Sequence, residues 1–164
     1  MVDYAKLIEE EKEKKDSAIS LTELQKKKDV ELPALFRSVE IALGEELAQA
    51  NDELKRRGAS TITGPFRPFI GEERIELGFG SRNPCCLITL QHTAVQVGLS
   101  RIHVELLDDE GKVIALTDYV IEGDSTALKM YKSLVEGFPD RASEISADEV
   151  AREIVPGIIR GRFA

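Results

Sequence analysis

Hydrophobic and polar residues alternate without interruption over residues 101–106. A β-strand places successive side chains on opposite faces of its sheet, so this pattern predicts a strand with one buried side and one solvent-facing side. Ile102, Val104 and Leu106 should face the core, while Arg101 and His103 should face away from it. The stretch from residue 74 to residue 121 is therefore expected to form the sheet around which the rest of the chain packs.

Three further stretches extend this sheet. Residues 74–79 alternate in the same way, residues 85–90 are almost continuously apolar, and residues 113–121 are rich in β-branched side chains. Short connections with glycine, proline and acidic residues separate them, which favours antiparallel neighbours. Four strands are expected, and five if residues 61–70 add an edge strand, because the two prolines of that segment confine it to an edge.

Residues 33–57 give the clearest helical pattern. Pro33 suits the first turn of a helix, and Gly58 stands where a C-terminal cap belongs. Apolar residues recur between them at intervals of three and four, which predicts an amphipathic helix. The stripe consists of Phe36, Val39, Leu43, Leu47, Ala50 and Leu54.

Two more helices are expected after the sheet. The first covers residues 126–136, which lie between the capping candidate Ser125 and the breakers Gly137 and Pro139. The second begins after Ser146, which forms a capping box with Glu149. Pro156 lies inside that second helix and should kink or end it.

Together these patterns predict an α+β fold with N-terminal helices, a four- to five-stranded antiparallel meander and two C-terminal helices. Residues 1–31 are rich in Lys and Glu and are interpreted as a charged helical arm, in which a second helix starts at Leu21 and ends near Lys28. Residues 32–164 are expected to form a single α+β domain.

The formal net charge of −8 disfavours binding to nucleic acid, because that binding depends on neutralising phosphates. No apolar run reaches the length of a membrane span, and the N-terminus lacks the pattern of a signal sequence. A cytoplasmic location without membrane contact is therefore expected.

Few residues suggest chemistry. Cys85, Cys86 and His92 have neither the number nor the spacing of a zinc site, so buried reduced thiols and no metal are expected. A Cys–His nucleophile pair would need the two side chains within hydrogen-bond reach. His103 is interpreted as a surface residue on the wet face of its strand, with an enzyme that uses His92 or His103 and a carboxylate as the less favoured alternative.

Four arginines, Arg67, Arg74, Arg82 and Arg101, fall in or near the sheet. If they share a face they could bind an anionic ligand, but ion pairs with neighbouring glutamates are the simpler interpretation. No catalytic residue and no cofactor is expected from these patterns.

The leading hypothesis is a non-catalytic protein–protein interaction module that acts as a homodimer or binds another protein. Acidic chaperones that hold a peptide segment of a partner are one such class. The hypothesis depends on the apolar faces of two helices, which are surplus if one copy of the chain does not bury them itself. The predicted interface residues are Leu43, Leu47, Leu54, Ile154 and Ile158.

The alternative is a small-molecule-binding domain with an apolar pocket between sheet and helix, in which one arginine fixes an anionic group. The predicted ligand-binding residues are Phe66, Phe69, Phe79, Arg82, Arg101 and Tyr119.

Overall fold

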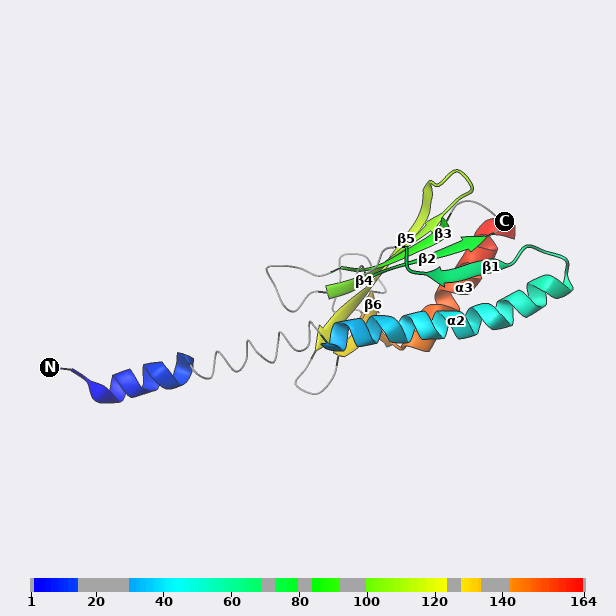
Figure 1. Ribbon diagram of the computed structural model, residues 1–164. Helices are drawn as coiled ribbons and strands as arrows, with labels where there is room; N and C mark the ends of the chain where they lie inside the picture. Colours follow the sequence, from blue (N-terminus) through cyan, green and yellow to red (C-terminus); the bar gives the residue numbers. More distant parts are fainter. Residues whose placement is uncertain are drawn as a thin grey trace.

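The computed structural model describes residues 2–14, 30–68, 73–79, 84–91, 100–123, 128–133 and 142–163. Its centre is one antiparallel sheet in which seven strands follow each other in chain order. The strands are β1 (Ile62–Phe66), β2 (Arg74–Phe79), β3 (Pro84–Gln91), β4 (Ser100–Leu107), β5 (Val113–Gly123), β6 (Leu128–Ser133) and β7 (Ala142–Ile145). The sheet curls into a half-barrel beside helices α2 (Leu32–Arg56) and α3 (Ala147–Phe163), and these two helices contact each other (Figure 1).

The predicted strands around residues 74–121 are confirmed, but the predicted fold is wrong in its strand number and in its C-terminal helices. The sheet has seven strands rather than four or five, and a single helix follows it. The whole described part of the predicted helix 126–136, residues 128–133, is strand β6, and β7 was not expected at all. The overall α+β class is retained.

A helix was predicted here because Ser125, Gly137 and Pro139 suit helix ends, and Lys132 obscures the alternation that marks strand β6. Leu128, Met130 and Lys132 alternate with outward-facing residues, but a lysine on the inner side hides this period of two. The structure provides Lys132 with a carboxylate from α3, Glu153, at 2.7 Å. Since that partner lies 21 residues away in the chain, the local pattern does not show that the position can accept a charge.

Helix α2 confirms the helix predicted from Pro33 to Arg57 and its cap. Gly58 has a φ of 68° and its N–H donates to the carbonyl of Lys55, while the N–H of Ala59 donates to the carbonyl of Leu54. These two bonds form the Schellman arrangement that requires a left-handed residue after the helix. Asn51, which lies in α2, then holds the start of the sheet, strand β1, against this helix.

Helix α3 begins at the predicted capping box. The N–H of Glu149 donates to Ser146 Oγ at 3.2 Å, and that hydroxyl donates to Glu149 Oε1 at 3.1 Å. The helix does not end at Pro156, since it continues to Phe163. Apolar residues before and after the proline, such as Val150 and Ile158, are buried and hold the helix against the sheet. The proline itself costs the helix one backbone hydrogen bond.

The sheet and the two helices enclose one hydrophobic core. Register places Ile75, Ile88 and Val104 side by side on neighbouring strands, and all three are buried. The next residues along each strand point to the opposite, outer face and are partly exposed. This outer face and the sheet's edges are therefore the surfaces that remain for binding.

The N-terminal arm contains a helix over residues 4–14, which starts after Asp3 and lies away from the sheet (Figure 1). Its apolar residues Tyr4, Leu7 and Ile8 are exposed. The second predicted arm helix, from Leu21 to Lys28, lies outside the described residues.

Candidate interaction site

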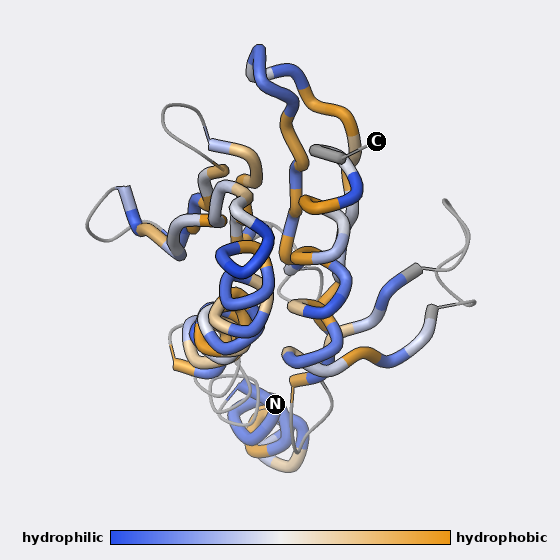
Figure 2. Tube along the Cα trace, turned by 90° about the vertical axis from the view of Figure 1, so that its right-hand side faces the viewer, coloured by the Kyte–Doolittle hydropathy of each residue, from blue (hydrophilic) through white to orange (hydrophobic). Residues whose placement is uncertain are grey.

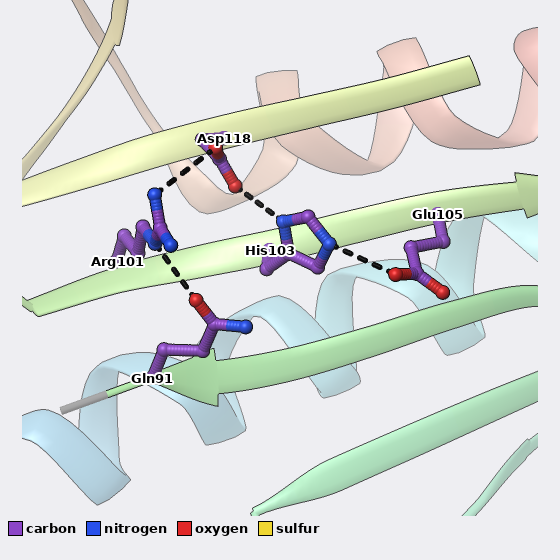
Figure 3. A network of polar contacts seen from close by, with 5 residues as sticks. All are labelled: Gln91, Arg101, His103, Glu105 and Asp118. Atoms are coloured by element: carbon purple, nitrogen blue, oxygen red, sulfur yellow. Dashed lines mark hydrogen bonds and ion pairs between the residues drawn. The ribbon is translucent and has the colours of Figure 1, made fainter.

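A chain of polar contacts crosses β3, β4 and β5 on the outer face (Figure 3). Arg101 Nε donates to Gln91 Oε1 at 2.7 Å, and its terminal nitrogen lies 3.4 Å from Asp118 Oδ2. The imidazole of His103 lies between two carboxylates, with Nδ1 2.5 Å from Asp118 Oδ1 and Nε2 3.1 Å from Glu105 Oε1. The strand register aligns these residues, because it pairs Gln91 with Arg101 and His103 with Asp118.

This network favours a protonated His103. Burial lowers the pKa of His103, but the hydrogen bonds and charges of Asp118 and Glu105 raise it by more, so the net shift is upward from 6.5. A doubly protonated imidazole donates from both nitrogens and has no lone pair with which to accept a proton from a substrate. The geometry therefore gives His103 the role of a link between β4 and β5 and provides no support for a general base.

The first half of β5 lies next to this network and forms an exposed edge of the sheet. Strand β6 pairs only with Tyr119–Gly123, and no described strand pairs with residues 113–118 on the side away from β4. Val113, Ile114 and Leu116 are exposed by 47%, 52% and 61%. Figure 2 shows the β4–β5 hairpin projecting beyond the rest of the sheet. We call residues 113–118 the β5 edge.

The two outermost strands are protected in ways that the β5 edge is not. Strand β1 has five residues, and its Pro65 has no N–H to offer a new neighbour. Strand β7 has only four residues. Short strands and prolines are common means by which proteins prevent pairing at sheet edges. The β5 edge contains no proline and is apolar at most of its positions, although a bulge interrupts its pairing with β4 near Leu107.

The predicted ligand-binding residues are not brought together. Phe66 on β1 is 55% exposed, whereas Tyr119 on β5 is buried. Three strands lie between them, so the path along the curled sheet is about 19 Å at the usual strand spacing. Phe79 packs against the core, and Arg101 belongs to the outer-face network. The remaining two, Phe69 and Arg82, lie outside the described residues.

A small apolar hollow lies between the β4–β5 hairpin and the end of α3. Its lining includes Cys85, Leu107, Ile114, Ile158 and Gly161, and it has room for roughly one water molecule. A metabolite would not fit there without movement of the surrounding side chains.

All five predicted interface residues are buried within a single copy of the chain. Leu43, Leu47 and Leu54 of α2 and Ile154 and Ile158 of α3 have exposures between 0% and 7%. The apolar helix faces are thus covered by the chain's own core. This burial removes the observation from which a dimer through these helices was inferred.

Sequence reasoning missed a polar cluster at the margin of the core. Glu153 Oε2 accepts from the hydroxyl of Tyr119 at 2.8 Å and from Lys132 Nζ at 2.7 Å. Burial, followed by the bond and charge of Glu153, raises the pKa of Tyr119, so the phenol stays protonated. The cluster ties α3 to β5 and β6. In the sequence, this cluster was indicated only by Glu153, a charged residue that neighbours the apolar positions of the last helix.

Cys85 and Cys86 are both buried and not disulfide-bonded, as predicted. Burial raises the pKa of Cys86, as do the charges of Cys85 and Glu105, which disfavours the reactive thiolate. His92 lies outside the described residues. Within the described ranges, no group of three or more His, Cys, Asp or Glu side chains is placed to hold a metal ion.

Of the four arginines singled out from the sequence, the three that the structure describes have carboxylate partners. Arg67 Nε donates to Glu40 at 2.6 Å and its guanidinium lies over the ring of Phe36, while Arg74 pairs with Glu76 at 3.4 Å. Arg101 in turn pairs with Asp118. Ion pairing is therefore found at all three, but only Arg74 has a neighbouring glutamate as its partner, as predicted.

Comparisons with protein-family models, with curated proteins and with solved structures found no match. A search of the described helices for a membrane span found none of sufficient length and hydrophobicity.

Proposed function

We propose that the protein is a protein–protein interaction module that binds an extended segment of a partner along the β5 edge. One observation carries the proposal: residues 113–118 combine exposed apolar side chains with a strand edge that has no described neighbour. Exposed large apolar side chains also occur on the N-terminal helix, at Ile41 of α2 and at Phe66 of β1. The first two positions lie on helices, and β1 is short and contains Pro65, so none of them combines exposure with a long strand edge.

The chemistry of a strand edge explains how binding would occur. An antiparallel strand directs alternate pairs of N–H and C=O groups towards each of its two neighbours. β4 uses one side of β5, and no described strand pairs with the groups on the other side of the β5 edge, which is where a strand would be added. Main-chain hydrogen bonds then supply affinity, while Val113, Ile114 and Leu116 select apolar side chains on the partner.

The outer-face network supports this proposal by holding the edge in shape. His103 and Arg101 on β4 both contact Asp118, which is the last residue of the β5 edge. A strand that is already ordered loses less conformational entropy when it binds. The network therefore contributes to binding without touching the partner.

Site-specific photo-crosslinking in cells tests the proposal. A photoreactive amino acid at Leu116 lies on the β5 edge, and the same amino acid at Ile41 of α2 is a matched control, because Ile41 is also a large exposed apolar residue, at 53%. We expect a discrete crosslinked product from position 116 and none from position 41. Absence of a product at position 116, or equal products at both positions, would contradict the proposal.

A further inference from the structure

We infer that His103, Asp118 and Glu105 form a pH-sensitive switch that sets how firmly the β5 edge is held to β4. The three residues lie together on the β4–β5 hairpin, and Asp118 is also the last residue of the β5 edge (Figure 3). This inference rests on the proposed function, because it adds a condition that regulates the same site. An edge that is held firmly loses less conformational entropy when a strand is added than an edge that frays.

The switch follows from the way in which both nitrogens of the His103 ring are used. Nδ1 faces Asp118 Oδ1 at 2.5 Å, and Nε2 faces Glu105 Oε1 at 3.1 Å. A protonated imidazole donates from both nitrogens, whereas a neutral imidazole has one N–H and one lone pair. Loss of a proton therefore turns a lone pair towards one of the two carboxylates, whichever tautomer forms.

Both neutral tautomers weaken the link between β4 and β5. If the remaining proton is on Nε2, the hydrogen bond to Asp118 is lost. If it is on Nδ1, that bond remains but is no longer assisted by a positive charge, and charge-assisted hydrogen bonds are roughly twice as strong as neutral ones. The contact between the two strands is therefore weaker above the pKa of His103 in either case.

The charges closest to His103 belong to the hairpin itself. Arg101 and Glu105 flank it on β4, and Asp118 faces it from β5. When His103 is neutral, the two carboxylates share Arg101 as their one cationic neighbour on these strands. The terminal nitrogen of Arg101 lies 3.4 Å from Asp118 Oδ2 and keeps its charge throughout, so deprotonation loosens the edge without detaching it.

The described residues of the other strands add no titrating group next to His103. Strand β3 places Thr89 opposite it, and the register of β6 puts Ser133 beside the end of the β5 edge. Arg74 lies one strand further away on β2, where it pairs with Glu76 at 3.4 Å. The proton on His103 therefore acts mainly on the contacts within the hairpin.

The same contacts set the direction of the switch. Burial lowers the pKa of His103, but the hydrogen bonds and charges of Asp118 and Glu105 raise it by more, so the midpoint of its titration lies above 6.5. The β5 edge is held most firmly below about pH 6.5 and loosens as pH rises through the folded-state pKa. The His103 side chain is 18% exposed, so protons reach it in the folded chain.

Hydrogen exchange of the purified full chain tests the switch. The amides of residues 113–118 that bond to β4 should lose about fivefold in protection factor as pH rises through the pKa of His103, while those of residues 62–66 in β1 should not. His103→Gln should show the low protection at every pH, and His103→Arg, which keeps its charge, the high protection. A wild-type protection factor that does not fall, or one that falls equally in either variant, overturns the inference.

NMR titration of the His103 ring provides a second check, which uses the wild type alone. The ring is assigned through its nuclear Overhauser contacts with the hairpin. The midpoint of its titration should coincide with the midpoint of the change in protection. Midpoints that differ by more than about one pH unit would assign the change to another group and overturn the inference.

Photo-crosslinking from Leu116, repeated in cell extract at about pH 6.5 and about pH 8.5, connects the switch to binding. The yield of the crosslinked product should be lower at the higher pH in the wild-type background and unchanged by pH in His103→Arg. Equal yields in the wild-type background, or the same fall in His103→Arg, overturn the regulation and leave the proposed function intact. A lack of product at both pH values overturns the proposed function and, with it, the regulation of binding.

Discussion

His103 and Asp118 face each other across β4 and β5, with His103 Nδ1 2.5 Å from Asp118 Oδ1. This contact joins a histidine whose pKa is raised by its carboxylate partners to the end of the only long apolar edge among the described strands. The stability of the hairpin should therefore depend on pH in a way that can be measured.

The upward shift of the His103 pKa fixes the sign of this dependence. Since the folded-state pKa lies above 6.5, the stabilisation by protonated His103 is fully present below about pH 6.5 and is lost as pH rises through the folded-state value. The difference in free energy of unfolding between wild type and His103→Gln should shrink with increasing pH. Urea unfolding at a series of pH values checks this, with Gln49→Ala, an exposed substitution that changes no titratable group, as the control. A difference that stays constant above about pH 6.5 would contradict the assignment.

Removal of Glu153 should leave two polar groups without their partner. In Glu153→Ala the Tyr119 hydroxyl and Lys132 both lose their hydrogen bond, and we expect a loss of about 1–3 kcal/mol in free energy of unfolding. Arg152→Ala, at an exposed position of the same helix, should change it by less than about 0.5 kcal/mol. Chemical denaturation compares the two variants, and equal losses would rule out a stabilising role for the cluster.

Asn51 acts as a substitute strand partner for the start of the sheet. Its Nδ2 donates to the carbonyl of Ile62, and its Oδ1 accepts from the N–H of Ile62, each at 2.8 Å. Asn51→Ala should lower the free energy of unfolding by about 1–3 kcal/mol and increase hydrogen exchange in β1. Gln49→Ala, on the exposed side of α2, should leave exchange in β1 unchanged. Unchanged exchange in Asn51→Ala would contradict the role of this amide.

Two helical glycines should respond differently to substitution. A Cβ at Gly44 would meet no atom within 4 Å, whereas a Cβ at Gly157 would lie 3.3 Å from Leu106 Cδ1. Gly44→Ala should therefore stabilise the protein by about 0.5–1 kcal/mol through helix propensity. At Gly157 the close contact offsets that gain, and Gly157→Leu should cost about 1–3 kcal/mol by overpacking. Thermal denaturation distinguishes them, and equal gains for both alanine variants would mean that α3 is not tightly packed on β4.

Much of the fold was predictable because it depends on local patterns. The stripe of α2, the Gly58 cap, the Ser146–Glu149 box and the alternation in β4 are each encoded within a few neighbouring residues. The candidate site was predictable only in part. Arg101 was named from its place on a strand, but its contacts with Gln91 and Asp118 follow from the register of three strands.

The sequence by itself determined the α+β class, the long first helix of the domain, the central strands and the buried thiols. These features were accessible because strand alternation and helical spacing show which side of an element is buried. Only the tertiary structure decided that Lys132 lies on the inner side of a strand, that both helix stripes are covered by one copy, and that the β5 edge is left without a described neighbour. Periodicity shows that a face must be buried or paired. It does not show against what, because that choice depends on residues that are distant in the chain and close only after folding.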